Sequence, residues 1–258
     1  MSTTAICEIA PGSAARLPQL KIREVKTSAV EVPMTYPLGT SAATVRKAPL
    51  LLIDLETEEG VTGRTYLFCY RPSIPRAVRK RLPDAIELPV DYNQALSVTE
   101  AIRRGRALES EGIAWLEEPI RHDDYVGNAA VARALAVPVQ IGENFNGPES
   151  MVEALGAAAC DYVMPDAARI GGVTGWIQAA GIAAGHRIEM SSHLLPEISA
   201  HLLAATPTCH YLEYVDWADA ILEEPLQIVD GFARVPNRPG IGLTWRPEAV
   251  KSFAADRS

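Results

Sequence analysis

From residue 86 onwards, short apolar runs alternate with helix-like stretches, and this alternation constrains the fold more than any other feature of the sequence. Ile113–Leu116 and Val137–Gly142 have the length and composition of buried strands, and Val173–Ala184 has the pattern of a helix. Strands that alternate with helices at this density form a parallel sheet with helical crossovers. We therefore expect an α/β domain over residues 83–258, including a C-terminal return.

One helix start is marked with particular clarity. Ser97 has Glu100 three residues after it, which is the spacing of a capping box. In such a box the serine side chain caps the backbone at the start of the helix. The pair predicts a helix that begins at Val98 and continues to about Ser110.

The first eighty residues follow a different pattern. Residues 1–20 are rich in Ser, Thr, Ala and Pro without a period, and we interpret them as a loose tail. Three β-rich stretches follow, with a turn at Gly60 between the second and the third, which predicts an antiparallel meander over residues 21–82. The first strand is expected to stop at Pro33. The 14-residue connection Met34–Lys47 is typical of a mobile lid or binding loop.

Composition excludes several classes of protein. Hydrophobic residues make up 48% of the chain and charged residues 22%, which indicates a globular protein and not a disordered one. The net charge of −8 argues against binding to nucleic acid or to an anionic membrane. The apolar runs are too short to span a bilayer, and residues 1–19 lack the pattern of a secretory signal. We expect a cytoplasmic protein.

An ionisable residue follows each of six predicted strands. The intervals between these residues are 26, 26, 23, 27 and 20, each about one strand plus one helix. A single acid after a strand is more often a helix cap or a solvated loop residue. In a (β/α) barrel, however, the carboxyl ends of the strands converge on one mouth, so the repeat predicts one shared site. Its members are Asp91, Glu117, Glu143, Asp166, His193 and Glu213.

The residue types suit a defined chemistry. Asp91, Glu117 and Glu143 form an all-oxygen set, which suits Mg²⁺. Such a cation stabilises negative charge that develops on a substrate carboxylate.

The remaining three residues suit proton transfer. A carboxylate such as Asp166 beside the His193 imidazole fixes its tautomer and makes it a better general base. Glu213, if protonated, could donate a hydrogen bond to an enolate oxygen. Together these groups describe removal of a proton next to a carboxylate.

Several stretches carry a resemblance to a known family. They are Val90-Asp91-Tyr92-Asn93-Gln94, Trp115-Leu116-Glu117-Glu118-Pro119, Ile141-Gly142-Glu143-Asn144, Met164-Pro165-Asp166, Ile170-Gly171-Gly172-Val173-Thr174-Gly175-Trp176 and Met190-Ser191-Ser192-His193-Leu194. These stretches resemble the mandelate racemase branch of the enolase superfamily, over about residues 21–246.

This resemblance implies a role for each candidate residue. The first three acids would bind Mg²⁺, the Asp166–His193 pair would be the base on one face of the α-carbon, and Glu213 would be the electrophilic acid. The meander would be the capping domain that closes over the substrate. The remaining implied substrate contacts are Asn93 and, in the lid, Leu38, Val45 and Tyr70.

The chain departs from this family in one large respect. The family has an eight-stranded barrel with a Lys-x-Lys motif on its second strand, which supplies the base for the opposite face. Here about 20 residues separate Tyr70 from Asp91, whereas one βαβ unit needs roughly 30 or more. The sequence contains no Lys-x-Lys. We expect α/β and α+β structure: an incomplete (β/α) barrel of about six strands with a truncated antiparallel capping domain, shortened near Arg79–Leu82.

A shortened barrel has structural consequences. Six strands of this length need a different tilt and stagger to close, so we expect an open or distorted sheet. Apolar surface would be exposed near Ile86–Val90 and near Tyr211. Pro89 is expected in an interior strand, where it would remove a ladder hydrogen bond.

Three functions remain open at this point. The first is Mg²⁺-dependent removal of the α-proton of a small 2-hydroxy acid through an enediolate, of the racemase type and impaired by the missing lysine. The second is a sugar-acid dehydratase of the same superfamily. The third is a non-catalytic remnant, which an open sheet edge favours. A dinucleotide site is disfavoured, because Gly171, Gly172 and Gly175 do not form GxGxxG. The sequence does not decide whether the chain is a homo-oligomer.

Overall fold

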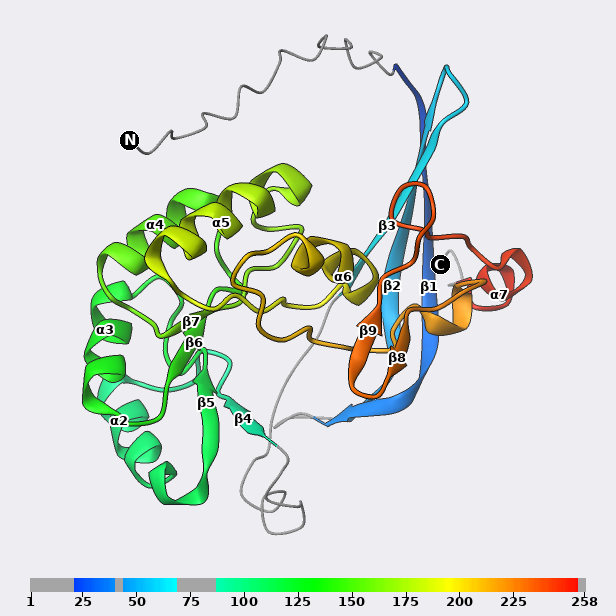
Figure 1. The fold of residues 1–258 in the computed structure, drawn as a ribbon. Helices are drawn as coiled ribbons and strands as arrows, with labels where there is room; N and C mark the ends of the chain where they lie inside the picture. Colours follow the sequence, from blue (N-terminus) through cyan, green and yellow to red (C-terminus); the bar gives the residue numbers. More distant parts are fainter. Residues whose placement is uncertain (1–20, 40–43, 69–86, 255–258) are drawn as a thin grey trace, which may run out of the picture.

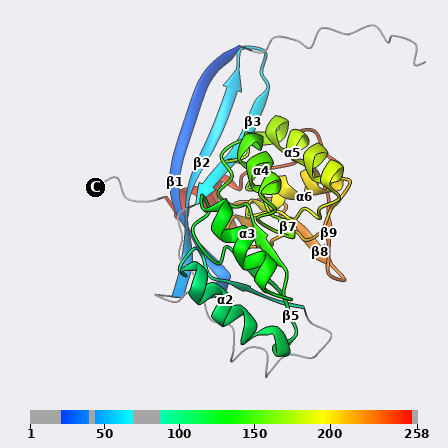
Figure 2. The same ribbon diagram turned by 90° about the vertical axis from the view of Figure 1, so that its left-hand side faces the viewer.

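The protein forms an antiparallel sheet that lies along one side of an α/β unit (Figures 1 and 2). The structure is a computed structural model, and it describes residues 21–39, 44–68 and 87–254. The predicted tail 1–20 and the predicted break at Arg79–Leu82 lie outside these ranges. Within them, no helix is both long enough and apolar enough to cross a membrane.

The antiparallel sheet confirms the predicted meander. Its strands are β1 (Ile22–Gly39), β2 (Thr44–Thr57) and β3 (Thr62–Phe68), in the order β1-β2-β3. Gly60, with φ +81°, occupies the turn between β2 and β3, in the left-handed region that glycine adopts without strain.

The first strand is longer than predicted. β1 continues through Pro33 to Gly39, with a register shift between Pro33 and Leu38. The predicted stop at Pro33 is therefore wrong, and the whole described part of Met34–Lys47 is strand and not a loop. The physical reason is position: β1 is an edge strand, where a missing N–H can face away from the ladder.

The α/β unit has a parallel sheet in sequence order, β4-β5-β6-β7. Its strands and the helices between them are β4 (Leu88–Asp91), α2 (Val98–Arg106), η1 (Glu109–Glu111), β5 (Ile113–Glu117), α3 (Tyr125–Ala134), β6 (Val139–Ile141), α4 (Pro148–Gly156), β7 (Tyr162–Val163), α5 (Gly172–His186) and α6 (Pro196–Ala204). At the start of α2, Ser97 accepts a hydrogen bond from the Glu100 backbone at 3.3 Å, as the capping box predicts.

The sheet continues beyond β7 through single bridges. Val163 pairs with Met190, and Met190 pairs with Cys209, both in parallel orientation. Four regular strands and these two further segments give six strand positions, in the predicted order. Among the described residues no bridge joins the last segment back to β4, and the open or distorted sheet stays a prediction.

The open edge at β4 explains why Pro89 is tolerated. Within the described part of the chain β4 pairs only with β5, and the register shifts between Leu88 and Val90, which passes over Pro89. Pro89 therefore lies in an edge strand of the described sheet, and its predicted interior position is wrong.

Exposure of apolar surface at the two edges is uneven. Tyr211 is 42% exposed, and Pro89 is exposed as well, as expected. Leu88 is half-buried and Val90 only 1% exposed, so the prediction is wrong for Val90. Val90 packs in a small separate cluster, which also contains Leu108, Ile113, Leu116 and Val137. Ile86 lies outside the described residues.

The C-terminal part of the chain joins the two units. It contains η2 (Asp219–Ile221), β8 (Gln227–Val229), β9 (Phe232–Arg234) and α7 (Pro247–Ser252). The backbone N–H of Glu31 in β1 donates to the carbonyl of Phe253 at 3.1 Å, and Val30 forms a bridge with Ala254. One apolar core includes residues from the antiparallel sheet, from the α/β unit and from this segment.

Candidate functional site

Asp166 and His193 meet at neighbouring strand ends. The two residues form a parallel bridge, and Oδ2 of Asp166 lies 3.0 Å from Nδ1 of His193. The other carboxylate oxygen of Asp166 accepts hydrogen bonds from the N–H groups of Ala168 and Arg169, at 2.7 and 3.1 Å. Burial alone would raise the pKa of Asp166, but its hydrogen bond to His193 and these N–H groups lower it below its usual value. Asp166 therefore stays ionised and fixes the orientation of the imidazole.

The second nitrogen of His193 faces another carboxylate. Nε2 lies 3.2 Å from Oε2 of Glu143, and the His193 side chain is 11% exposed. Burial lowers the pKa of His193, but hydrogen bonds to Asp166 and Glu143 outweigh it, so the pKa lies well above its usual value. In this arrangement the ring holds its proton between two acids.

Asp91 and Glu117 are direct neighbours across the sheet. They are register partners at the ends of β4 and β5. Burial raises the pKa of Asp91 to about 6, and the charge of Glu143 adds to this effect. Burial also raises the pKa of Glu117 to about 8, with a contribution from the charge of Asp91. The charge of His193 opposes these shifts, but burial and the repulsion between the acids outweigh it.

The carboxylates of the three predicted metal ligands do not lie together around one point. Within residues 21–39, 44–68 and 87–254, no three His, Cys, Asp or Glu side chains lie in positions that could hold a metal ion together. Glu143 is turned toward His193, while Oε2 of Glu117 accepts hydrogen bonds from Trp115 Nε1 and Gln140 Nε2, at 3.0 and 3.1 Å. The expectation that the three carboxylates converge even without a metal is therefore wrong. Their oxygen donors and their mutual repulsion nevertheless fit a divalent cation.

Glu213 is held by the segment that carries His193. Its Oε2 accepts a hydrogen bond from the Leu194 N–H at 2.6 Å, and its own N–H donates to Ser192 Oγ at 3.1 Å. Burial raises the pKa of Glu213, although the charge of His193 acts in the opposite direction. A carboxyl group of this kind is suited to remain protonated and donate a hydrogen bond.

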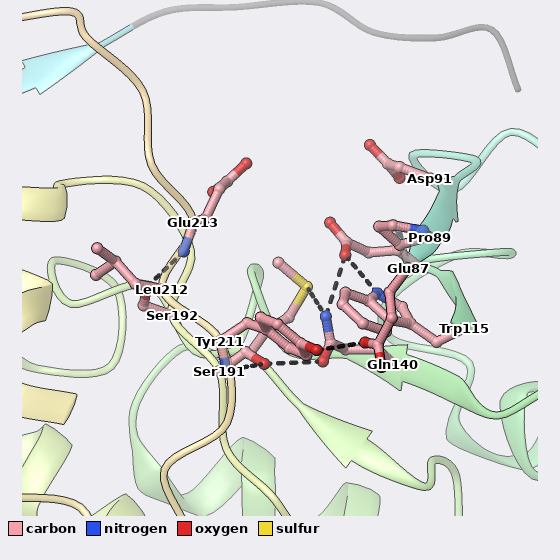
Figure 3. A pocket seen from close by; sticks show the side chains of 12 residues that line it. Glu87, Pro89, Asp91, Trp115, Gln140, Ser191, Ser192, Tyr211, Leu212 and Glu213 are labelled. Carbon is pink, nitrogen blue, oxygen red and sulfur yellow. Dashed lines mark hydrogen bonds between the residues drawn. The ribbon is translucent and has the colours of Figure 1, made fainter. Parts of the chain in front are cut away.

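A pocket of about 390 Å³ opens between β4 and the last strand segment. Figure 3 shows Asp91 and Glu213 on opposite sides of it, with Trp115, Gln140 and Tyr211 deeper inside. Among the described residues its lining contains four acids and no Lys, Arg or His: Glu87, Pro89, Asp91, Trp115, Glu117, Gln140, Met164, Ser191, Ser192, Tyr211, Leu212 and Glu213. The pocket therefore brings together three of the six predicted residues, with Asp166, His193 and Glu143 outside its lining.

The predicted substrate contacts are only partly described. Asn93 follows β4 with φ 42°, and its N–H donates to Oδ1 of Asp91 at 2.6 Å. Leu38, at the end of β1, and Val45, at the start of β2, are register partners. Tyr70 lies outside the described residues. The assignment of these residues to a substrate lid stays a prediction.

Sequence reasoning missed several residues that support the site. Glu118 is fully buried, and its Oε1 accepts a hydrogen bond from the Gly142 N–H at 2.8 Å, next to Glu143. Arg169 donates to the carbonyl of Glu143 at 3.1 Å. Gln140 contacts Glu117. A polar residue inside an apolar strand, as in Val139-Gln140-Ile141, is the signal that could have identified Gln140.

Two family profiles match the sequence. Residues 72–249 match the family described as "Enolase C-terminal domain-like", and residues 22–95 match the "Mandelate racemase / muconate lactonizing enzyme, N-terminal domain". The chain belongs to the mandelate racemase and muconate lactonizing enzyme family. Its parallel sheet and capping strands are those of the enolase-superfamily fold.

Members of this family with assigned activities match in part. The L-talarate/galactarate dehydratase of Salmonella typhimurium is 35% identical over 67% of this chain and 44% of its own length. The 3,6-anhydro-alpha-L-galactonate cycloisomerase of Streptomyces coelicolor is 34% identical over 69% of this chain and 50% of its own length. The chain thus spans about half the length of the curated relatives it matches.

A solved structure of this family is similar in fold. It is an enolase from Bradyrhizobium in complex with magnesium and mandelic acid, with a TM-score of 0.82 and 29% identity, covering 92% of this chain and 99% of the other. Solved relatives with other described activities were also crystallised with magnesium, among them an L-talarate dehydratase from Polaromonas, at 21% identity and a TM-score of 0.76.

Proposed function

We propose that this chain removes the α-proton of a 2-hydroxy carboxylic acid in a Mg²⁺-dependent reaction through an enediolate, with His193 as the base. The observation that carries this proposal is the 3.0 Å contact between Asp166 and His193 at neighbouring strand ends, beside buried acids. Asp166 orients the ring through Nδ1, which leaves Nε2 as the atom that accepts the proton.

Asp91, Glu117 and Glu143 would hold the metal. When bound, Mg²⁺ supplies positive charge for the carboxylate and enediolate oxygens of the substrate. Glu143 is turned toward Nε2 of His193 at 3.2 Å, so a base role for Nε2 requires Glu143 to release it. Turning Glu143 toward the other two acids would meet both requirements.

Glu213 would act as an acid toward the same substrate. It lies across the pocket from Asp91 (Figure 3), and burial favours its protonated form. A protonated Glu213 would donate a hydrogen bond to the oxygen on which negative charge develops. In this role Glu213 only donates a hydrogen bond, while His193 removes the α-proton, so the two residues have separate tasks.

The proposed reaction is one-sided. His193 reaches one face of the α-carbon, and the sequence has no Lys-x-Lys to serve the other face. We therefore propose the racemase type of chemistry in an impaired form: exchange of the α-proton of one enantiomer without efficient conversion to the other. Loss of one positioned base costs about 10²–10⁴-fold.

A sugar-acid dehydratase is the second candidate, and its support is the identity to an L-talarate/galactarate dehydratase. In that reaction His193 would also remove the α-proton, and a protonated group would then expel the neighbouring hydroxide as water.

A non-catalytic remnant is the third candidate. The internal shortening, the domain boundaries at residues 20 and 82, a cytoplasmic location and the oligomeric state stay predictions.

Proton NMR in deuterated buffer separates the three candidates. Each pure enantiomer of mandelate, and separately galactarate, is incubated with the protein and Mg²⁺, with His193→Asn as the control. Loss of the α-proton signal from one mandelate enantiomer without loss of optical rotation, absent in the control, supports the one-base reaction. A 3-deoxy-2-keto acid formed from galactarate supports the dehydratase. Racemisation at an enzymatic rate contradicts the one-sided mechanism, and no change with any substrate favours the remnant.

A further inference from the structure

Gln140 is a buried amide in the middle of β6. Gln140 is 1% exposed, and its neighbours Val139 and Ile141 are apolar residues that are 0% and 1% exposed. A primary amide in such a place costs free energy unless its donors and acceptor are paired. Its partners therefore show what the position requires.

Gln140 connects a predicted metal ligand to a chain of polar groups. Nε2 donates to Oε2 of Glu117 at 3.1 Å, and Oε1 accepts from Ser191 Oγ at 3.2 Å (Figure 3). Ser191 Oγ in turn lies 3.2 Å from Nδ1 of His210, and it accepts a hydrogen bond from the Tyr211 N–H at 3.3 Å. These residues come from four strand positions of the sheet: β5, β6 and the two segments that follow β7.

An ionised Glu117 fixes the direction of every hydrogen bond in this series of polar groups, from Glu117 to His210. A carboxylate only accepts, so Gln140 must present its NH₂ group to Glu117 and its carbonyl oxygen to Ser191. Ser191 has a single hydroxyl hydrogen, which it therefore donates to Gln140. The Ser191 oxygen is then left as an acceptor toward His210, which must carry its proton on Nδ1.

We propose that Gln140, Ser191 and His210 form a one-directional donor chain that positions the Glu117 carboxylate for a divalent cation. The inference rests on the proposed function, because it takes Glu117 as a metal ligand. Gln140 is the positioning residue: it holds one oxygen of Glu117 and fixes the rotamer from which the other oxygen faces the pocket. Partners of this kind orient metal ligands and commonly change metal affinity 10–100-fold when removed.

The first test is a calorimetric Mg²⁺ titration of the whole chain. Gln140→Met keeps the length of the side chain and removes its N–H donor, and Ser191→Ala removes the next link. The matched control is Thr206→Val, which removes a buried hydrogen bond from Trp176 Nε1 (3.0 Å) in the same unit without a link to Glu117. We expect a loss of affinity of about 10–100-fold for Gln140→Met, a smaller loss for Ser191→Ala and none for Thr206→Val.

The second test measures the wild type itself, and a substitution serves only to assign the signal. Nitrogen-15 NMR of the Mg²⁺-loaded wild type reports the tautomer of His210, whose signal is assigned by its disappearance in His210→Asn. Burial lowers the pKa of His210, so the ring is neutral at pH 7.5. We expect the proton on Nδ1, whereas imidazole in water prefers Nε2. A purely structural role for Gln140 would not impose this tautomer.

The outcomes separate this inference from the proposed function. A wild type that binds Mg²⁺ together with an unchanged affinity for Gln140→Met, or with His210 protonated on Nε2, overturns the donor chain and leaves the metal site intact. A wild type that binds no Mg²⁺ overturns the metal site, and the donor chain with it. Reduced affinity in Gln140→Met with the Nδ1 tautomer in the wild type supports both.

Discussion

An added methyl group at Gly175 should disturb the loop that carries Asp166. A Cβ atom at Gly175, in the first turns of α5, would lie 1.8 Å from the carbonyl oxygen of Ile170, whereas a comfortable C···O contact is about 3.3 Å. The loop must therefore retreat by roughly 1.5 Å. The Ile170 N–H is bonded to the carbonyl of Asp166 at 2.9 Å, so the movement would reach the Asp166–His193 pair.

The cost of Gly175→Ala follows from two opposing effects. Overpacking at a backbone contact costs about 3 kcal/mol, at the upper end of the usual range. Alanine in place of glycine in a helix returns about 1 kcal/mol. We expect the free energy of unfolding to fall by about 2 kcal/mol and Tm to fall by roughly 4–8 °C.

Gly181→Ala is the matched control, since a Cβ there, in the same helix, meets nothing within 4 Å. This variant should gain about 0.5–1 kcal/mol. Urea unfolding followed by tryptophan fluorescence measures both variants. The steric reasoning is refuted if Gly175→Ala is as stable as the wild type, or if both variants lose stability equally.

Three further predictions concern charge and capping. Asp166→Asn removes the carboxylate 3.0 Å from His193, so the pKa of His193 should fall toward its usual value in an NMR titration; an unchanged value would refute the pairing. The pKa of Asp91 is raised to about 6 and that of Glu117 to about 8, so the metal-free folded protein keeps protons that the unfolded chain releases. Its free energy of unfolding should therefore fall as pH rises from about 4 to 8, and Mg²⁺ should reverse the fall; chemical denaturation at stepped pH measures this, and a rise over the same range would contradict it. Asp124 caps α3 by accepting a backbone N–H at 2.8 Å, so Asp124→Ala should cost about 1 kcal/mol in thermal unfolding, and an unchanged Tm would count against the cap.

The sequence predicted those features that depend on local pattern. Ser97 caps α2 because the capping box needs only neighbouring residues. Asp166 and His193 meet because each follows a strand and adjacent parallel strands end at the same edge. Neither feature depends on how distant parts of the chain pack.

Features that depend on sheet position or on a counter-charge were not predictable in this way. Pro33 was expected to end a strand and Pro89 to lie in an interior strand, but both lie in edge strands of the described sheets, β1 and β4, which is a tertiary property. The partners of the predicted metal ligands were not predictable either, because Glu143 contacts His193 and Glu117 contacts Trp115 and Gln140, all of them tertiary contacts.

The contact between the antiparallel sheet and the C-terminal segment can form only late in biosynthesis, because the two parts are made far apart in time. Val30, Leu50 and Leu52 of the antiparallel sheet lie in the same core as Trp217 and other residues made much later. At 5–20 residues per second, a ribosome needs roughly 10–40 s for the about 200 residues from Leu52 to Ala254. Throughout that interval the apolar face of the early sheet lacks the C-terminal part of its core. During translation this nascent sheet therefore exposes apolar surface of the kind that chaperones bind.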